Sequence, residues 1–245
     1  MDDSQIVPGA PASDFAITGV RPLPDQIAEA IVVMIASGQL QSGQRIVEAE
    51  LAERLNTSRV PVREAMRRLE AQGILATVPY RGTRVGAFGE REQAQAAEAR
   101  IALEGLIFRQ AARALRAAPS RVADLDQVLA DMQCCVAANN RLALNRADLA
   151  FHHAMCRLTG NPILVTLWQA IAPHVLIAFG LSNARYPNSQ AVLDQHIRLR
   201  AALLNAPLDD LPGLAERHVN GADLVAPASV GEQHTALTES HDGMN

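Results

Sequence analysis

One carboxylate and three imidazoles in the second half of the sequence could bind a metal ion. Asp148 and His152 are four residues apart in the segment DLAFH, so on a helix they project from one face. His196 and His218 follow later in the chain and could complete a set of one aspartate and three histidines. These ligand types suit a divalent first-row ion, zinc first and nickel or manganese next, with further coordination positions open to water or an anionic ligand.

Simpler interpretations of the same residues remain open. Asp-x-x-x-His pairs are common on helices, where they cap helix ends or form surface ion pairs. His153 lies beside the pair and should point elsewhere, and His174 could be an alternative ligand or an ordinary core histidine. Three histidines and an aspartate could also activate water in an enzyme, but no unassigned carboxylate or nucleophile stands out as a general base. The sequence therefore favours a binding site over an enzyme.

Three arginines at helical spacing form a second group. Arg59, Arg63 and Arg67 recur at i, i+4 and i+8 in the segment SRVPVREAMRRL. The apolar residues of this segment repeat at i, i+3, i+4 and i+7, which is the pattern of an amphipathic helix. Guanidinium groups in such a row can pair with phosphates or donate two hydrogen bonds to guanine. The alternative is a solvated helix face, partly balanced by nearby glutamates.

The arginines lie on the second of two short predicted helices within residues 48–69. Ser58 is placed to cap that helix by accepting a hydrogen bond from a free amide, and Pro61 falls in its first turn. An apolar stripe from Ile27 to Ile35 predicts a preceding helix. This is the pattern of a helix-turn-helix, which lays its second helix in the DNA major groove.

A predicted β-hairpin completes the N-terminal unit. Residues 74–78 and 83–85 are typical of short strands, and between them Gly82 can supply a positive φ. Arg81 at the tip could reach the DNA backbone or the minor groove. Between Arg59 and Arg84 there are six arginines and two glutamates, whereas the whole chain has a formal net charge of -4. Basic charge is thus concentrated where DNA would bind.

The segment SRVPVREAMRRLEAQGIL, followed by YRGTRV, closely resembles the winged-helix domain of the GntR superfamily of bacterial transcription regulators, over roughly residues 23–88. The resemblance implies DNA contacts from the arginine beside the serine, from the arginine four residues on, and from the wing tip. It departs at Ala49, where many members carry an arginine. The DNA-binding residues predicted are Ser58, Arg59, Arg63, Arg67, Arg81, Gly82 and Thr83.

Beyond Phe88 the sequence shows long helical patterns without strand signals. Helices are predicted at 90–115, 119–138 and 142–158, and prolines at 162, 187 and 207 divide the rest into three more, with a possible break at Pro173. This predicts an antiparallel all-helical bundle, a fold that builds metal and ligand sites in its core. The expected fold class is mainly α, with an N-terminal winged helix-turn-helix, whose wing is a small β-hairpin, and a C-terminal helical bundle.

The segments DLAFHHAMCRLTGNPIL, LDQH and AERH look like the FCD effector domain of the FadR subfamily, over roughly residues 92–224. The resemblance implies that Asp148, His152, His196 and His218 bind a metal whose open positions take a small carboxylate. EARIALE resembles the first effector helix, whose arginine commonly faces the pocket, so Arg100 could pair with that carboxylate. The alternative is a surface arginine paired with Glu104.

Composition agrees with a protein of the cytoplasm. The chain has 245 residues, of which 49% are hydrophobic and 3% aromatic, so its core must be mostly aliphatic and suited to helices. Residues 1–21 lack a signal-peptide pattern, and no apolar stretch is expected to reach the ~20 residues of a membrane helix. The three cysteines make a poor disulfide framework.

We therefore predict a metabolite-responsive transcription regulator that binds a palindromic DNA operator as a homodimer and responds to a small organic acid. Its parts would be a flexible arm (1–21), a winged helix-turn-helix DNA-binding domain (22–88), an effector and dimerisation domain (90–225) and a flexible tail (226–245). The alternatives are a metal-dependent enzyme and a DNA-binding protein with a purely structural metal. Sequence alone does not choose between repression and activation.

Overall fold

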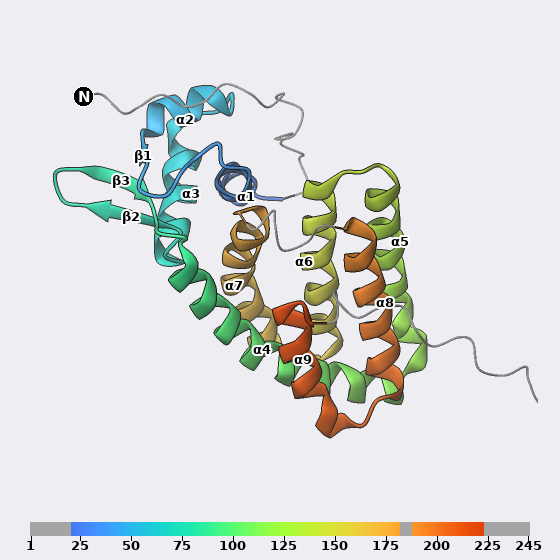
Figure 1. Cartoon of the computed structure of the whole chain (residues 1–245). Helices are drawn as coiled ribbons and strands as arrows, with labels where there is room; N and C mark the ends of the chain where they lie inside the picture. Colours follow the sequence, from blue (N-terminus) through green and yellow to red (C-terminus); the bar gives the residue numbers. More distant parts are fainter. Residues whose placement is uncertain (1–20, 182–187, 223–245) are drawn as a thin grey trace, which may run out of the picture.

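The computed structural model describes residues 21–181 and 188–222 of the chain. Apart from Arg21, the predicted flexible arm and tail lie outside these residues. The described elements form two groups, an N-terminal head at the top left of Figure 1 and a helical bundle below and to its right. The long helix α4 (Glu90–Ala117) runs from the head into the bundle.

Three helices and a small sheet make up the head. They are α1 (Leu23–Ala36), α2 (Glu48–Arg54) and α3 (Arg59–Ala71). As predicted, α3 buries one apolar stripe, which consists of Val62, Ala65, Met66 and Leu69. Ser58 occupies the N-cap position, but its side chain makes no capping hydrogen bond, so that prediction is wrong. Pro61 takes the N3 position, so only the N2 amide of the two usual donors to an N-cap oxygen is present.

The sheet has three antiparallel strands in the order β1-β3-β2. The predicted hairpin consists of β2 (Leu75–Val78) and β3 (Gly82–Val85), which pair with Thr77 opposite Thr83. Gly82 has the expected positive φ of 75°, and Tyr80 at the tip is also left-handed, at 62°. β1 (Arg45–Ile46) was not predicted, because two residues are too few to show alternation. The hairpin projects from the body as a wing (Figure 1).

The bundle consists of α4 and five further helices, as the sequence predicted. These are α5 (Ala123–Ala137), α6 (Arg141–Leu158), α7 (Pro162–Leu181), α8 (Ser189–Asn205) and α9 (Leu211–Asn220). Short 3-10 helices, η2 (Pro119–Val122) and η3 (Leu208–Asp210), precede α5 and α9. Asparagines fix the starts of three helices: Asn140, Asn161 and Asn188 each accept a hydrogen bond from a first-turn amide.

Helix α7 belongs to both groups of elements. Pro173 lies inside it without interrupting it. Trp168, in its first half, is buried in the bundle core, whereas Leu176 and Ile177, in its second half, join the core of the head. Near its end, a Cβ added to Gly180 would lie 2.0 Å from the carbonyl oxygen of Ala36 in α1, so this contact requires glycine. Helix α7 therefore contributes buried side chains to both cores.

The expectation that no apolar stretch is long enough to cross a membrane does not hold for α7. This helix has 20 residues and is long and apolar enough by length and composition alone. A core helix of a globular protein passes the same test, and α7 supplies buried residues to two cores.

Candidate DNA-binding face and candidate metal centre

The second helix of the helix-turn-helix exposes its arginines. Arg59, Arg63 and Arg67 are all exposed on α3, on the side away from its buried stripe. Val60 lies on the same side and is 73% exposed, which is unusual for a large apolar side chain. Sequence reasoning missed Val60, although its i, i+3, i+7 relation to Arg63 and Arg67 places it on the arginine face. An apolar side chain there can contact a thymine methyl group in the major groove.

Arg63 is held by a carboxylate from the preceding helix. Its Nε lies 3.1 Å from both carboxylate oxygens of Glu48, and its Nη2 donates to Glu48 Oε2 at 2.8 Å. The hydrogen bond from Arg63 lowers the pKa of Glu48, and the charges of Arg59 and Arg67 add to this effect. Glu48 begins α2, so the ion pair joins the two helices of the motif. This pair could not be predicted from the sequence, because its members are 15 residues apart.

The wing residues divide into exposed and anchored side chains. Arg81 and Tyr80 at the tip are exposed. Thr83, one of the predicted DNA contacts, instead places its hydroxyl 2.8 Å from that of Thr77 and 3.4 Å from Glu70 Oε1 of α3. Thr83 therefore ties the wing to α3.

Arg45 is a basic residue beside the wing that sequence reasoning missed. It lies on β1 directly opposite Arg84 of β3. Its side chain also approaches the wing glycine, because Arg45 Nε would lie 3.4 Å from a Cβ on Gly82. The only available signal was its position shortly before the helix-turn-helix.

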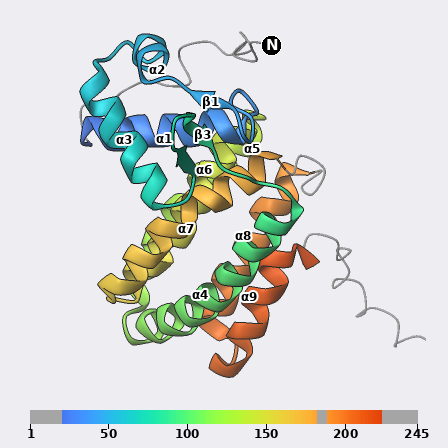
Figure 2. The ribbon, with the colours of Figure 1, turned by 90° about the vertical axis from the view of Figure 1, so that its left-hand side faces the viewer.

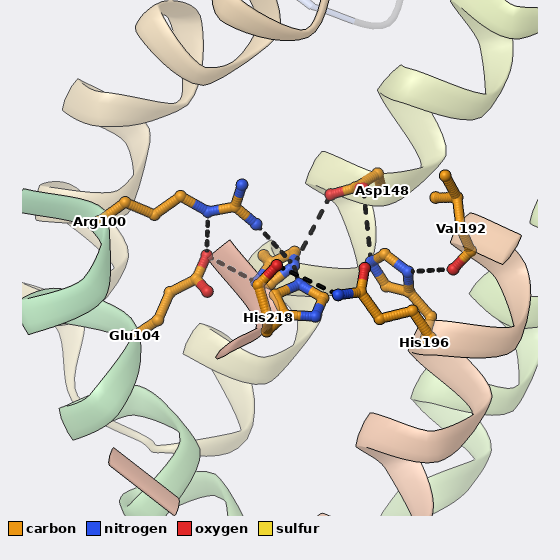
Figure 3. Close-up of polar contacts among 8 residues, drawn as sticks. Arg100, Glu104, Asp148, Val192, His196 and His218 are labelled. Atoms are coloured by element: carbon orange, nitrogen blue, oxygen red, sulfur yellow. Dashed lines mark hydrogen bonds and ion pairs between the residues drawn. The ribbon is translucent and has the colours of Figure 1, made fainter. Parts of the chain in front are cut away.

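The structure brings the four predicted metal ligands together in the bundle core. Asp148 and His152 come from α6, His196 from α8 and His218 from α9, and all four are at most 6% exposed. Figure 3 shows Asp148, His196 and His218 converging from these helices. One ring nitrogen from each histidine lies within 4.8 Å of the other two. Asp148 Oδ1 is 3.6 Å from His152 Nε2, and its Oδ2 is 3.5 Å from His196 Nε2.

Neighbouring acceptors set the tautomers of two of these histidines. His196 Nδ1 lies 2.8 Å from the carbonyl oxygen of Val192, which can only accept, so Nδ1 carries the proton. His152 Nδ1 lies 2.9 Å from Glu104 Oε1, which favours the same tautomer. Both Nε2 atoms then carry a lone pair. That of His196 faces Asp148, and that of His152 also lies 3.2 Å from the donor Arg100 Nη2. Partners on the other ring nitrogen are typical of metal-binding histidines.

The donor set fits a divalent cation. Among the described residues, Asp148 Oδ1 and His196 Nε2 are buried without a hydrogen-bond partner. His152 Nε2 and His218 Nε2 lie only 3.0 Å apart. Buried polar atoms are rarely left unpaired, because each then loses its water contacts without replacement. A cation bound between the aspartate and the imidazoles would satisfy these atoms together.

Arg100 and Glu104 line the same site. Arg100 Nε donates to Glu104 Oε1 at 2.6 Å, and Arg100 Nη2 lies 3.2 Å from His152 Nε2. The alternative interpretation of the sequence was a surface arginine paired with Glu104. The pair is present, but both side chains are buried and do not lie at the surface. Phe179 of α7 covers the guanidinium, with the Arg100 Cζ 5.3 Å from the ring centroid. Glu104 is thus a site residue that sequence reasoning named only as a surface partner.

Burial and neighbouring charges shift the pKa values of this cluster. Burial opposes the ionised form of Asp148, but the imidazoles of His196 and His152 and the guanidinium of Arg100 outweigh it and lower the pKa to about 2. Burial lowers the pKa of His218 well below its ordinary value, and the nearby histidines and Arg100 lower it further. Burial also lowers the pKa of His152. A carboxylate beside neutral imidazoles is the protonation state that metal binding requires.

His174 was considered as an alternative metal ligand or a core histidine; it is neither part of the histidine cluster nor fully buried. Its Nε2 lies 2.8 Å from the carbonyl oxygen of Gln72, the C-cap residue of α3, and its ring is 6.1 Å from that of Phe88. It is therefore a contact between α7 and the head. His153 is half-buried, and burial lowers its pKa. It is not part of the His152, His196 and His218 group.

Comparison with known families finds two matches within the chain. Residues 23–85 match the family described as bacterial regulatory proteins, gntR family. Residues 95–221 match the FCD domain. The first match covers the helices and wing of the head, and the second covers the bundle helices that carry the metal ligands.

The relatives found are transcription regulators. The chain is 31% identical over 166 residues to a probable D-xylose utilization operon transcriptional repressor of Paenarthrobacter nicotinovorans, covering 68% of this chain and 72% of that protein. It is 29% identical to the Glc operon transcriptional activator of Escherichia coli K12, covering 80% and 84%. Among solved structures it resembles E. coli McbR/YncC with a TM-score of 0.65 and 22% identity, covering 84% of this chain and 94% of that one, which supports the fold.

Proposed function

The chain belongs to the GntR family of bacterial transcription regulators and carries an FCD domain, and we propose that a metal ion and a small organic acid bound in its bundle set its affinity for an operator. The proposal assigns DNA binding to residues 22–88 and effector binding and dimerisation to residues 90–225. It places the protein in the cytoplasm, where its DNA lies.

In this proposal α3 enters the major groove. Arg59, Arg63 and Arg67 face outward together. Two carboxylates lie among the exposed arginines of α3, Glu48 paired with Arg63 and Glu64 paired with Arg68. The wing, with Arg81 at its tip, would contact the backbone or the minor groove beside it. Phosphate contacts give affinity and base contacts give sequence preference.

The effector site is the Asp148 and histidine cluster together with Arg100. Asp148, His152, His196 and His218 would hold the metal, which would supply a positive charge and open coordination positions to a ligand. Arg100 adds a second cation within 3.2 Å of His152, placed to pair with a carboxylate. The name of one relative, the gluconate operon transcriptional repressor of Bacillus subtilis, mentions an organic acid, which supports this ligand class.

Helix α7 is the proposed connection between effector and operator. In its first half the Trp168 ring stacks on His152, with centroids 5.2 Å apart and an interplanar angle of 24°. In its second half Phe179 covers Arg100, while His174 bonds the C-cap carbonyl of α3. A ligand that moves His152 or Arg100 would therefore act on the helix that holds the recognition helix. Such coupling is typically worth ~1–3 kcal/mol and must be reciprocal.

The proposal includes a homodimer formed through α7 and α4. These helices pack together and lie on the side of the molecule that faces the viewer in Figure 2. Ile163 and Leu167 of α7 are 67% and 48% exposed, and Leu106 of α4 is 37% exposed. A second copy is the expected partner, because a two-fold dimer matches a palindromic operator with one head per half-site.

The observation that carries the proposal is the buried, partly unpaired Asp148 and histidine cluster in a chain with a GntR head. The test is to select a binding sequence from random DNA and then measure its affinity with zinc, with zinc plus each of a panel of small carboxylates, and after chelation. We expect at least one acid to change operator affinity about 5- to 150-fold, and only with metal present. If no acid does so while chelation lowers thermal stability, the metal is structural and the regulatory part of the proposal is wrong.

A further inference from the structure

The ion pair between Glu48 and Arg63 is unusual in its place. It joins the first residue of α2 to the outward face of α3, where Arg63 is 54% exposed and Glu48 33% exposed. Isolated exposed ion pairs contribute little to stability, with a median of ~0–1 kcal/mol. Stability is therefore a weak reason for placing an acidic side chain against Arg63 on the outward side of α3.

The pair leaves the guanine-binding edge of Arg63 free. Glu48 contacts Nε and Nη2, so both hydrogens on Nη1 and the second hydrogen on Nη2 remain available. A bidentate contact with guanine O6 and N7 requires two such donors from one guanidinium. Arg63 can therefore keep its ion pair and donate to guanine at the same time.

We propose that Glu48 is a positioning residue that holds Arg63 as a reader of guanine. This inference rests on the proposed function, because it requires α3 to lie in the major groove. By fixing the guanidinium before DNA binds, Glu48 lowers the side-chain entropy lost on binding. It also holds the plane of the guanidinium in one orientation, so that only a base with two suitably placed acceptors is well bound.

Charge supports a base contact over a phosphate contact for Arg63. A guanidinium paired with a carboxylate has little net charge, so it gains little from neutralising a phosphate. The Glu48 carboxylate would also repel a phosphate that approached Arg63. Arg59 and Arg67 lie on either side along α3 and are the side chains suited to phosphate anchoring, whereas Arg63 is suited to specificity.

The test compares base preference in variants of the full-length, metal-loaded protein. Random duplexes are selected with the native protein, and its consensus is then titrated with every base at each half-site position. Arg63→Ala identifies the position that Arg63 reads. Glu48→Ala and Glu48→Gln should lower the preference for guanine at that position about three- to tenfold while changing other positions little. Adding Glu48→Ala to Arg63→Ala should cause no further loss there.

Glu50→Gln is the matched control. Glu50 is exposed and also lies in the first turn of α2, so its replacement removes the same charge from the same helix end. Equal effects of Glu48→Gln and Glu50→Gln would overturn the inference, as would Glu48 variants that bind all duplexes more tightly with unchanged base preference. If Arg63→Ala changes no base preference, the proposed base-reading role of Arg63 fails as well. If Arg63→Ala lowers the preference for guanine but the Glu48 variants do not, the positioning role of Glu48 is refuted and the base-reading role of Arg63 stands.

Discussion

His174 of the bundle donates a hydrogen bond from Nε2 to the carbonyl oxygen of Gln72, the residue that ends the recognition helix, across 2.8 Å. The two residues are 102 positions apart in the sequence. The bond joins α7, which covers the proposed effector site, to α3, the proposed DNA-contacting helix. A carbonyl at a helix end lacks a partner within its own helix, so His174 also satisfies a group that would otherwise need water.

Replacing His174 by alanine should weaken communication between effector and operator. We expect the acid-induced change in operator affinity to fall about three- to tenfold, because α7 loses its polar contact with the end of α3 while its apolar contacts remain. Operator titrations with and without the acid measure this. His153→Ala is the control, since it also replaces a half-buried histidine of the bundle. Equal coupling in the two variants would contradict the role of His174.

Gly180→Ala should destabilise the packing of the head on the bundle. The added methyl would meet the backbone of Ala36, which cannot move aside as a flexible side chain could. We expect a loss of about 1–3 kcal/mol in the free energy of unfolding, measured by urea denaturation. Gly213→Ala is the matched control, because its Cβ would meet only the Arg217 side chain, at an ordinary 3.6 Å. An unchanged stability in Gly180→Ala would show that the close approach of α7 to α1 is absent in solution.

Glu104→Gln should lower metal affinity about 10- to 100-fold, because Glu104 orients His152 and raises its basicity. Competition between the protein and a chromogenic zinc chelator gives the affinity. Glu98→Gln changes an exposed residue of the same helix and should have no effect. The melting temperature of both metal-free variants must be measured too, because Arg100 loses its buried ionic partner in Glu104→Gln. An unaltered zinc affinity would exclude the outer-shell role.

The metal-free protein should lose stability as the pH falls below about 6.5. The folded-state pKa of His218 and that of His152 are lowered, chiefly by burial, so the unfolded chain binds protons first. Their effect is absent well above the unfolded pKa of 6.5 and grows as the pH falls toward the folded values. Asp148 adds a further loss of stability as the pH falls from 3.8, its pKa in the unfolded chain, to about 2, its pKa in the folded protein. Urea denaturation with chelator from pH 8 to 5 should show the decline, and His218→Gln should reduce its slope. A flat profile would mean that these imidazoles are solvated.

A charge on the exposed apolar face of α7 should prevent dimerisation. Leu167→Glu places a carboxylate at the centre of the proposed interface, where it would be desolvated without a partner. We expect sedimentation to show monomers and operator binding to weaken. Gln169→Glu, an exposed change on the same helix, tests whether charge alone has this effect. A Leu167→Glu protein that remained dimeric would move the interface elsewhere.

Periodic patterns in the sequence determined most of the fold. Val62 and Met66 belong to the buried stripe of α3. Once one face of an amphipathic helix is buried, the opposite face must point outward, which sets the direction of Arg59, Arg63 and Arg67. Prolines indicated several helix boundaries of the bundle. The spacing of Asp148 and His152 placed both on one face of α6, and resemblance supplied His196 and His218, which the structure brings to the same point. The helix faces could be predicted because they depend on local periodicity, whereas His196 and His218 came from resemblance alone.

Tertiary structure alone decided the contacts between distant segments. The pairing of Glu48 with Arg63, the burial of Arg100 with Glu104 and the bond from His174 to Gln72 each depend on how two helices approach one another. Helical periodicity assigns a side chain to a face but does not say what lies opposite. It also could not show that α7 would be shared by two cores, because an apolar run has the same sequence whether one partner or two cover it.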